Sequence, residues 1–484
     1  VRLVRDPAGV GAITPAGKHK KHRMSDNHHS RREQRSGNPF WTALLRGVLL
    51  PAGDRLFGQR MMQRLKFLES AQWWEAERIR DYREQLLSSL VQTAYSEVPF
   101  YRQLWDEAKV DVNSIRSVDD LQRLPIVTKD LLRQQDASRI SRATGQRTYR
   151  TCTSGSTGTP FCIQEDARTA GWYRASFMLS LEWAGWTIGE RHLQTGMTLK
   201  RSQGRWLKDL LLRCHYVSAY DLRDEKLDAA LEQIERYRIQ HLWGYPGSLY
   251  YLARRARELG WNQPLKSAVT WGDMLYPPHR KLIESTFQTR VFDTYGCAEG
   301  LQIAAQCGCS SGYHIHELDV IVEYLDDNGQ PVQAGEPGNV VITRLHPGPT
   351  PLIRYFVGDI AVSAKGQVCG CKRNLELLAS VQGRNADVVL TPSGNRLIVH
   401  FFTGILEHFI EIRAFQVVQE NIDSMLIRVV PQASYSEETT VRVVKALQQH
   451  GADDIDIRVE LAETLPLSPT GKHRFIISQL EKQL

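Results

Sequence analysis

Long apolar runs are missing from this sequence. None approaches the roughly 18 consecutive apolar residues that a membrane-spanning helix needs, and residues 1–37 lack the apolar core of a signal peptide. We therefore expect a cytoplasmic protein with no stable membrane insertion. Residues 40–50 are largely apolar and include Arg46, so they could lie on a membrane surface. The favoured interpretation is a helix packed on the body of the protein.

A basic excess is also missing from most of the chain. The formal net charge is +7, but residues 1–37 hold nine Lys and Arg against three acidic residues, which leaves 52 basic and 51 acidic residues elsewhere. A nearly neutral body does not indicate a nucleic-acid partner, because such binding depends on neutralising phosphates. Residues 1–37 are predicted to be a disordered basic tail.

Cysteine is scarce, with eight residues in 484, and this does not suggest the disulfide framework of a secreted protein. Four cysteines form two short pairs, and two histidines follow the first pair: Cys307 and Cys309, Cys369 and Cys371, with His314 and His316. Such thiolate and imidazole ligands can converge into a closed tetrahedral zinc site. The alternative is a set of buried thiols without metal, since C-x-C spacing is less specific than C-x-x-C.

The length predicts two to four domains. The order of the predicted elements indicates the α/β class. Helical periodicity over residues 72–96, 221–237 and 247–259 alternates with short apolar strands at 239–243, 267–271 and 290–293. Residues 318–362 are strand-rich with Gly and Pro turns, which predicts a β subdomain. The expected division is a tail over 1–37, a large domain over 38–382, and a small mobile α+β lid over 383–484, with strands, helices and a hairpin at 414–430.

The stretch at residues 151–160, Thr-Cys-Thr-Ser-Gly-Ser-Thr-Gly-Thr-Pro, combines two glycines with six hydroxyl side chains. Glycine allows a close backbone approach, and hydroxyls with backbone N–H groups suit anionic oxygens, so a phosphate-binding loop is one interpretation. No lysine follows Gly158, as a Walker A loop would require, and residues 161–164 look like a strand. The other interpretation is a Ser/Thr-rich hairpin turn without a ligand.

Four further stretches carry chemistry. Residues 293–299 and 353–359 each end with a Gly turn and an acidic residue, as if presenting Glu299 and Asp359 to a cleft. Arg384 follows Gly383 at the predicted domain junction, and Lys472 lies on a Gly/Pro loop near the C-terminus. Taken singly, each residue is equally well explained as a turn, a salt-bridge partner or a solvated side chain.

In order and spacing, these stretches resemble the motifs of the adenylate-forming (acyl-CoA synthetase) superfamily, in particular its phenylacetate-CoA ligase and CapK-like branch. The match begins at Val98-Pro99-Phe100-Tyr101-Arg102 and Leu124-Pro125-Ile126-Val127-Thr128-Lys129, and it ends at Lys472. It covers roughly three quarters of the chain, and several motifs in the right order are more specific than any one of them.

The resemblance implies a role for each matching residue. The loop would hold the β- and γ-phosphates of ATP through Thr153, Ser154, Gly155, Ser156, Thr157 and Gly158. Catalysis would fall to Lys472, Glu299 and Thr157, with Glu299 as the Mg²⁺ ligand and Lys472 reaching the α-phosphate and the carboxylate. The nucleotide would further contact Gly272, Asp273, Tyr295 and Gly296 around adenine, Asp359 at the ribose hydroxyls, and Arg384 at the junction.

The implied reaction is activation of a carboxylic acid with ATP and Mg²⁺ to an acyl-adenylate, followed by acyl transfer to coenzyme A after the lid rotates. One departure affects the second step. The family junction reads Gly-Arg-x-Asp-Asp, whereas residues 383–387 are Gly-Arg-Asn-Ala-Asp, so alanine replaces the usual hinge carboxylate. Transfer to an amine, hydroxyl or sugar, as in capsule-associated relatives, therefore stays open, as does a non-catalytic ATP-binding relative.

The resemblance extends to the metal and to the acid. Some relatives carry a Cys, His and Cys-x-Cys set where this chain has Cys307, His314, Cys369 and Cys371, with Cys309 or His316 as substitutes. A structural Zn²⁺ is expected, because four protein ligands leave no open position. Trp243 and Tyr245 would line the pocket for an arylacetate-like acid, although both could instead be core residues. A homodimer is left open.

Overall fold

The structure is a computed structural model that describes residues 38–152, 161–196, 201–219, 222–309, 312–384, 388–393, 396–406, 408–466 and 475–480. Internal contacts divide the chain into residues 1–36 and 37–484, and the account below concerns the second unit. The predicted disordered tail lies outside the described residues. Within the described part of the chain, no helix combines the length and apolar character that crossing a bilayer requires.

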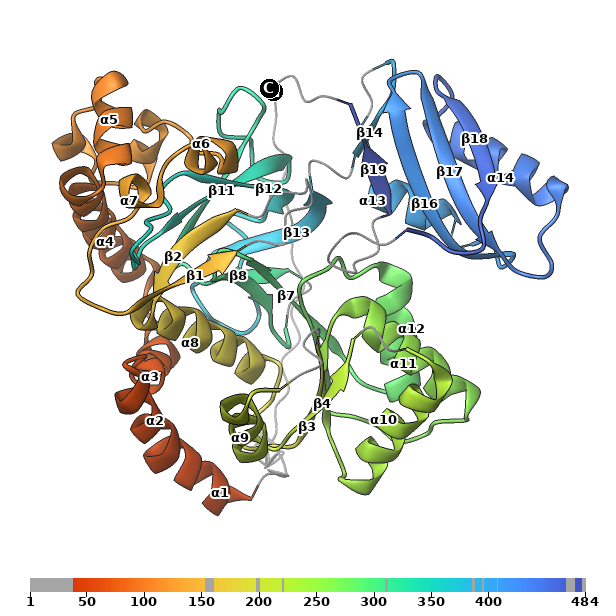
Figure 1. The fold of residues 1–484 in the computed structure, drawn as a ribbon, viewed down its shortest axis with the longest axis horizontal. Coiled ribbons are helices and arrows are strands. Elements are labelled where there is room, and N and C mark those ends of the chain that lie inside the picture. Colours follow the sequence, from red (N-terminus) through yellow and green to blue (C-terminus); the bar gives the residue numbers. More distant parts are fainter. Residues whose placement is uncertain are drawn as a thin grey trace, which may run out of the picture. The chain divides into compact units, whose positions relative to one another are not determined.

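Helices form the N-terminal part of the described chain (Figure 1). Asn38 caps the first of them by accepting hydrogen bonds from the backbone N–H groups of Phe40 and Trp41. The predicted helix over 72–96 is confirmed as α4, and Pro99 separates it from the next helix. The elements are α1 (Pro39–Leu44), the π-helical η1 (Leu45–Leu49), α2 (Leu50–Phe57), α3 (Met61–Ala71), α4 (Ala76–Glu97), α5 (Pro99–Glu107), the 3-10 turns η2 (Val112–Ser114) and η3 (Asp119–Arg123), α6 (Lys129–Arg133) and α7 (Ala137–Ile140).

A parallel α/β layer follows, as the alternating pattern predicted. Its strands run in the order β4-β3-β5-β6-β7, and β5 and β6 are buried throughout, which explains their short, uninterrupted apolar sequences. The strands are β3 (His192–Gly196), β4 (Cys214–Ser218), β5 (His241–Gly244), β6 (Ser267–Thr270) and β7 (Val291–Cys297). The helices are α8 (Ala167–Trp183), α9 (Gln203–Leu212), α10 (Asp224–Arg236), α11 (Pro246–Glu258) and α12 (Pro277–Phe287). Figure 1 shows α10, α11 and α12 grouped beside β3 and β4.

The strand-rich region predicted over residues 318–362 is confirmed as antiparallel strands, and these strands continue the same sheet. Strand β7 pairs in parallel with β6 and antiparallel with β8, so the order continues as β7-β8-β9-β13-β12-β11-β10. These strands are β8 (Leu301–Gln306), β9 (Tyr313–Ile315), β10 (Val320–Leu325), β11 (Pro337–Arg344), β12 (Tyr355–Ser363) and β13 (Leu377–Arg384). A local sequence pattern predicts strands but not the long-range pairing that joins them.

The C-terminal residues form a four-stranded sheet in the order β18-β17-β16-β19. Strands β16 and β17 form the hairpin that was predicted at residues 414–430. The core of this C-terminal unit includes Phe415 and Val417 of β16, Ile427 of β17, and Val443 and Leu447 of α14. The elements are β14 (Val388–Leu390), β15 (Arg396–Ile398), α13 (Val399–Leu406), β16 (Ile412–Asn421), β17 (Ser424–Pro431), α14 (Glu437–Gln449), β18 (Asp456–Leu461) and β19 (Ile476–Ser478). The predicted boundary after residue 382 falls inside β13, so a lid domain over 383–484 stays a prediction.

Candidate functional site

Strand β7 is where the two halves of the sheet meet, and Glu299 follows it directly. Only 2% of Glu299 is exposed. Its Oε1 accepts a hydrogen bond from the Tyr355 hydroxyl at 2.6 Å and lies 3.3 Å from the Lys129 ammonium. Glu299 therefore lies just beyond the carboxyl end of a parallel strand, the end of an open α/β sheet at which ligands bind.

Asp359 meets the same strand from β12. Its Oδ2 accepts a hydrogen bond from the Tyr295 hydroxyl at 2.8 Å. Asp359 lies inside β12, which corrects the expectation that it follows a strand. The backbone bends there nonetheless, because Gly358 has a φ of +88° and the pairing register of β12 shifts nearby.

The two carboxylates create a buried negative environment. Burial raises the pKa of Tyr355 well above its usual range, and Glu299 and then Asp359 raise it further. The pKa of the Cys297 thiol is raised in the same way, by burial first and then by the two carboxylates. A region that already contains two anionic side chains is suited to a divalent cation and to hydroxyl donors.

Arg344 connects this region to the strand that ends the predicted phosphate loop. Its Nη1 lies 2.6 Å from the Glu165 carboxylate of β2 (Cys162–Asp166), and its Nη2 donates to the Gly300 carbonyl at 3.0 Å. The Arg344 side chain is fully buried and that of Glu165 is 3% exposed. The pair therefore fixes β2 beside the turn that carries Glu299.

Strands β1 (Thr148–Cys152) and β2 (Cys162–Asp166) form an antiparallel pair on either side of the loop, and β2 confirms the strand predicted at residues 161–164. Cys152 and Cys162 lie directly opposite each other and form a disulfide that the sequence did not predict. The loop residues themselves, Thr153, Ser154, Gly155, Ser156, Thr157 and Gly158, lie outside the described residues, as does Lys472. Their roles stay predictions.

Gly272, predicted near adenine, is in contact with Tyr245. Its φ is +79°, and a Cβ at this position would lie 2.7 Å from the Tyr245 ring, so only glycine fits. The neighbouring Asp273 is exposed, and Gly296 is placed by β7 next to Tyr295. The backbone of Arg384, the predicted junction residue, pairs with that of Asp359 across β12 and β13.

Trp243 occupies a core position. It is 4% exposed, and its ring stacks on His192 with centroids 3.6 Å apart and meets Trp186 edge-on. Of the two predicted pocket aromatics, Tyr245 lies beside the predicted nucleotide residue Gly272, whereas Trp243 packs as a core residue.

His192 itself makes the core sensitive to acid. Burial lowers its pKa to about 3, while an unfolded histidine titrates near 6.5. The unfolded chain thus binds the proton more tightly, and stability is lost as pH falls from about 6.5 towards 3. Replacing His192 with Phe keeps a ring against Trp243 and removes the imidazole that binds this proton in the unfolded chain. The Glu190 carbonyl, which faces His192 Nδ1 at 3.2 Å, keeps its bond from Trp186.

We expect His192→Phe to be about 1 kcal/mol less stable than the wild type at pH 7.5, for the lost hydrogen bond. At pH 4.5 it should be about 1–2 kcal/mol more stable, because the wild type loses about 1.4 kcal/mol per pH unit through this group. Urea unfolding at both pH values measures the crossover. His450→Phe, on the surface at the end of α14, is the control and should show none. Parallel pH curves for His192→Phe and wild type would contradict the assignment.

The predicted metal ligands converge. Cys307, His314, Cys369 and Cys371 place their ligand atoms within 4.8 Å of one another. The two buried thiols, Cys307 and Cys369, are 3.5 Å apart, and Cys371 Sγ lies 3.2 Å from His314 Nε2. Three sulfurs and one nitrogen at this spacing fit the tetrahedral coordination of Zn²⁺. His314 Nε2 faces the cluster.

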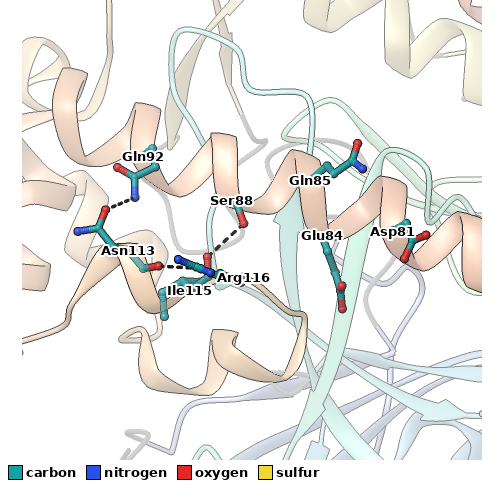
Figure 2. Close-up of a pocket in the computed structure, with 8 residues that line it drawn as sticks. All are labelled: Asp81, Glu84, Gln85, Ser88, Gln92, Asn113, Ile115 and Arg116. Carbon is teal, nitrogen blue, oxygen red and sulfur yellow. Dashed lines mark hydrogen bonds between the residues drawn. The ribbon is translucent and has the colours of Figure 1, made fainter.

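A groove of about 530 Å³ runs along α4, apart from the predicted site residues (Figure 2). Figure 2 shows Gln92 bonded to Asn113, and the Ser88 hydroxyl donates to the Ile115 carbonyl. Its polar side chains thus serve the packing of α4 on the following segment. None of the predicted site residues lines it.

Sequence analysis missed three residues that support the site, namely Lys129, Tyr355 and Arg344. Two of them lay inside quoted motifs. Residues 124–129 lead into α6, and Val127 pairs with Tyr355, so the two motifs that contain Lys129 and Tyr355 are adjacent in space. Arg344 carried no local signal, because its partners are 179 and 44 residues away.

The sheet, its change from parallel to antiparallel pairing at β7 and the C-terminal unit define the fold of the adenylate-forming ligases. Solved structures of 2-hydroxyisobutyryl-CoA ligase match it: the complex with 2-HIB-AMP in the postadenylation state has a TM-score of 0.69 at 19% identity, covering 85% of this chain and 92% of that one. The resemblance predicted from the motifs is thus confirmed at the level of the fold.

More particular similarities point to the predicted branch. Residues 389–479 match the family described as the CapK C-terminal domain. The phenylacetate-coenzyme A ligase of Thermus thermophilus is 26% identical over 65% of this chain and 72% of its own length. The ligase of the same name from Pseudomonas putida is 21% identical over 84% of this chain and 87% of its own length. The chain is similar to phenylacetate-CoA ligases and carries a CapK-type C-terminal domain.

Proposed function

We propose that this chain is an AMP-forming ligase that activates a carboxylic acid with ATP and transfers the acyl group to coenzyme A. The observation that carries the proposal is the convergence of Glu299 and Asp359 beside β7, held by Tyr355 and Tyr295. These are the two carboxylates that the motif resemblance assigns to magnesium and to ribose.

The chain's own residues would divide the first half-reaction as follows. Asp359 would accept the two ribose hydroxyls, because one carboxylate can accept from two adjacent donors. Tyr295 and Gly272 would border adenine. Glu299 would hold Mg²⁺, which supplies charge neutralisation to the phosphates when bound. Lys129, beside Glu299, orients that carboxylate.

The acid oxygen would then attack the α-phosphorus, and the bond from that phosphorus to the bridging oxygen of pyrophosphate would break. Lys472 would offset the negative charge that develops there. In the second half-reaction a thiolate displaces AMP from the acyl carbon, and the thiol proton passes to solvent. Residues 153–158 would bind the departing phosphates through backbone N–H groups and hydroxyls.

The acid is proposed to be arylacetate-like. Two observations support this: the relatives named as phenylacetate-CoA ligases, and the Tyr245 ring placed against Gly272. A flat aromatic side chain favours a flat apolar substituent on the acid.

A second acceptor class is supported by specific features. The C-terminal unit matches the CapK C-terminal domain, and Ala386 stands where the family junction carries a carboxylate. Transfer to an amine, hydroxyl or sugar would keep the adenylation site unchanged. Formation of AMP without dependence on coenzyme A would distinguish this alternative.

Zn²⁺ is proposed as a structural ion held by Cys307, His314, Cys369 and Cys371. Four protein ligands complete its tetrahedral shell, so the ion would stabilise the loops around β9 and the segment before β13. It takes no part in the proposed reaction.

The test is ATP–pyrophosphate exchange across aryl, arylacetic, fatty and amino acids. We expect one acid class to support exchange and Lys472→Ala to lower it by about a thousandfold, the scale of losing a transition-state contact. Lys445→Ala on α14 is the matched control and should exchange normally. ATP binding without exchange for any acid would instead support a non-catalytic relative.

A further inference from the structure

An exposed apolar surface is formed by the first helices and α9. Seven large apolar side chains here are at least half exposed: Phe40 (74%), Val48 (56%), Leu56 (79%), Phe57 (66%), Trp206 (61%), Leu207 (50%) and Leu210 (58%). We call these residues the α1–α9 apolar surface. Only eleven other large apolar side chains are exposed across the rest of the described chain, so exposure is concentrated in these two short segments.

The two segments lie side by side. The Trp41 indole N–H donates to the Leu211 carbonyl at 3.2 Å, and the Arg213 guanidinium lies 5.5 Å from the Trp41 ring centre. Figure 1 shows α9 near the first helices, in agreement with these contacts. The apolar side chains of the two segments therefore belong to one region of the surface.

Helix α9 exposes three large apolar side chains, while its Leu211 and Leu212 pack against the core. Its one buried residue is Asp209, which pairs with Arg201 at 2.6 Å, while Trp206, Leu207 and Leu210 are exposed. A helix on an aqueous surface normally buries its apolar residues and exposes its charged ones. This arrangement indicates that the exposed side of α9 meets an apolar phase.

The two segments that form this surface are net positive. Residues 38–60 hold three basic residues against one acidic, and residues 201–213 hold four against one. Together they carry +5 of the chain's formal charge of +7.

We propose that the α1–α9 apolar surface docks on the surface of an anionic lipid bilayer. Exposed Trp, Phe and Leu side chains would enter the boundary between headgroups and acyl chains, and the surrounding Arg and Lys residues would attract anionic headgroups. A second copy of the chain is a poorer occupant, because two equally basic faces repel each other. None of these residues belongs to the proposed ligase site, so the docking proposal is independent of that function.

The test is flotation of the full chain with vesicles of phosphatidylcholine alone or of phosphatidylcholine with one quarter phosphatidylglycerol. We expect at least tenfold stronger partitioning to the anionic vesicles, weakened by 0.5 M salt. Leu56→Glu/Phe57→Glu and Trp206→Glu/Leu210→Glu should each lower partitioning at least tenfold. Val441→Glu and Leu259→Glu replace apolar residues that are 62% and 55% exposed elsewhere, and both should bind as the wild type does.

A direct readout accompanies the variants, in case a substitution disturbs folding. Brominated lipid should quench tryptophan fluorescence of the wild type on anionic vesicles, and the quenching should be smaller in Trp206→Phe. Equal binding to neutral and anionic vesicles, or unchanged binding of both double variants, would overturn the proposal. Concentration-dependent dimerisation that the double variants abolish, without vesicle binding, would assign the surface to a second copy.

Discussion

Asp359→Asn is expected to raise the KM for ATP about a hundredfold while kcat in the exchange reaction changes less than tenfold. The proposed ribose contacts are made equally in the ground state and the transition state, so their loss appears in binding. Two hydrogen bonds to an anionic acceptor contribute about 1.5–3 kcal/mol each, and asparagine, which is neutral, retains part of that. Exchange measured over a range of ATP concentrations gives both constants.

The ribose assignment can be separated from a structural effect. Wild type should discriminate against 2′-deoxy-ATP and 3′-deoxy-ATP, and Asp359→Asn should lose most of that discrimination. Tyr295→Phe keeps the ring and removes the hydroxyl that donates to Asp359 Oδ2 at 2.8 Å, so it should raise KM less than tenfold. If Asp359→Asn still distinguishes the deoxynucleotides as well as wild type, Asp359 does not bind the ribose.

The site residues that sequence motifs could predict are those whose chemistry is carried by a local pattern. Glu299 and Asp359 each end a short motif with a glycine turn, and the structure brings both beside β7. The Cys and His pairs likewise predicted a cluster of metal-ligand residues, because C-x-C is itself a short-range feature. Helix and hairpin periodicity was sufficient for α4, α14 and the β16–β17 pair.

Other features depend on contacts that no local pattern encodes. The role of Arg344 arises from Glu165 and Gly300, which approach it only in the folded sheet. The strands of the predicted β subdomain are joined to the parallel layer because β7 pairs with β6 on one edge and with β8 on the other. Trp243 suited either a ligand pocket or the core by composition, and no local pattern predicts that its ring stacks on His192 of a neighbouring strand.

Cys369→Ser is expected to lose the proposed zinc and to lower the melting temperature by about 10 °C. Removing one of four ligands from a structural site forfeits most of the metal's contribution to folding. Losing the metal should lower the free energy of unfolding by about 3–5 kcal/mol. Each kcal/mol lowers the melting temperature by about 2–4 °C in a domain of 150–250 residues. Metal analysis of purified wild type should give one zinc per chain, and thermal unfolding with and without a chelator measures the stability that it supplies.

Cys214→Ser is the matched control, because Cys214 is a partly buried free thiol on β4 outside the cluster. It should keep both the zinc and the melting temperature. The alternative to bound zinc is a disulfide, because Cys307 and Cys369 lie 3.5 Å apart and could be joined under oxidising conditions. Thiol titration of metal-free protein before and after reduction distinguishes that disulfide from free thiols. A wild type that contains no metal and melts at the same temperature with or without chelator would show that these thiols pack without zinc. In that case Cys369→Ser should cost only about 1 kcal/mol, the scale of a single buried polar substitution.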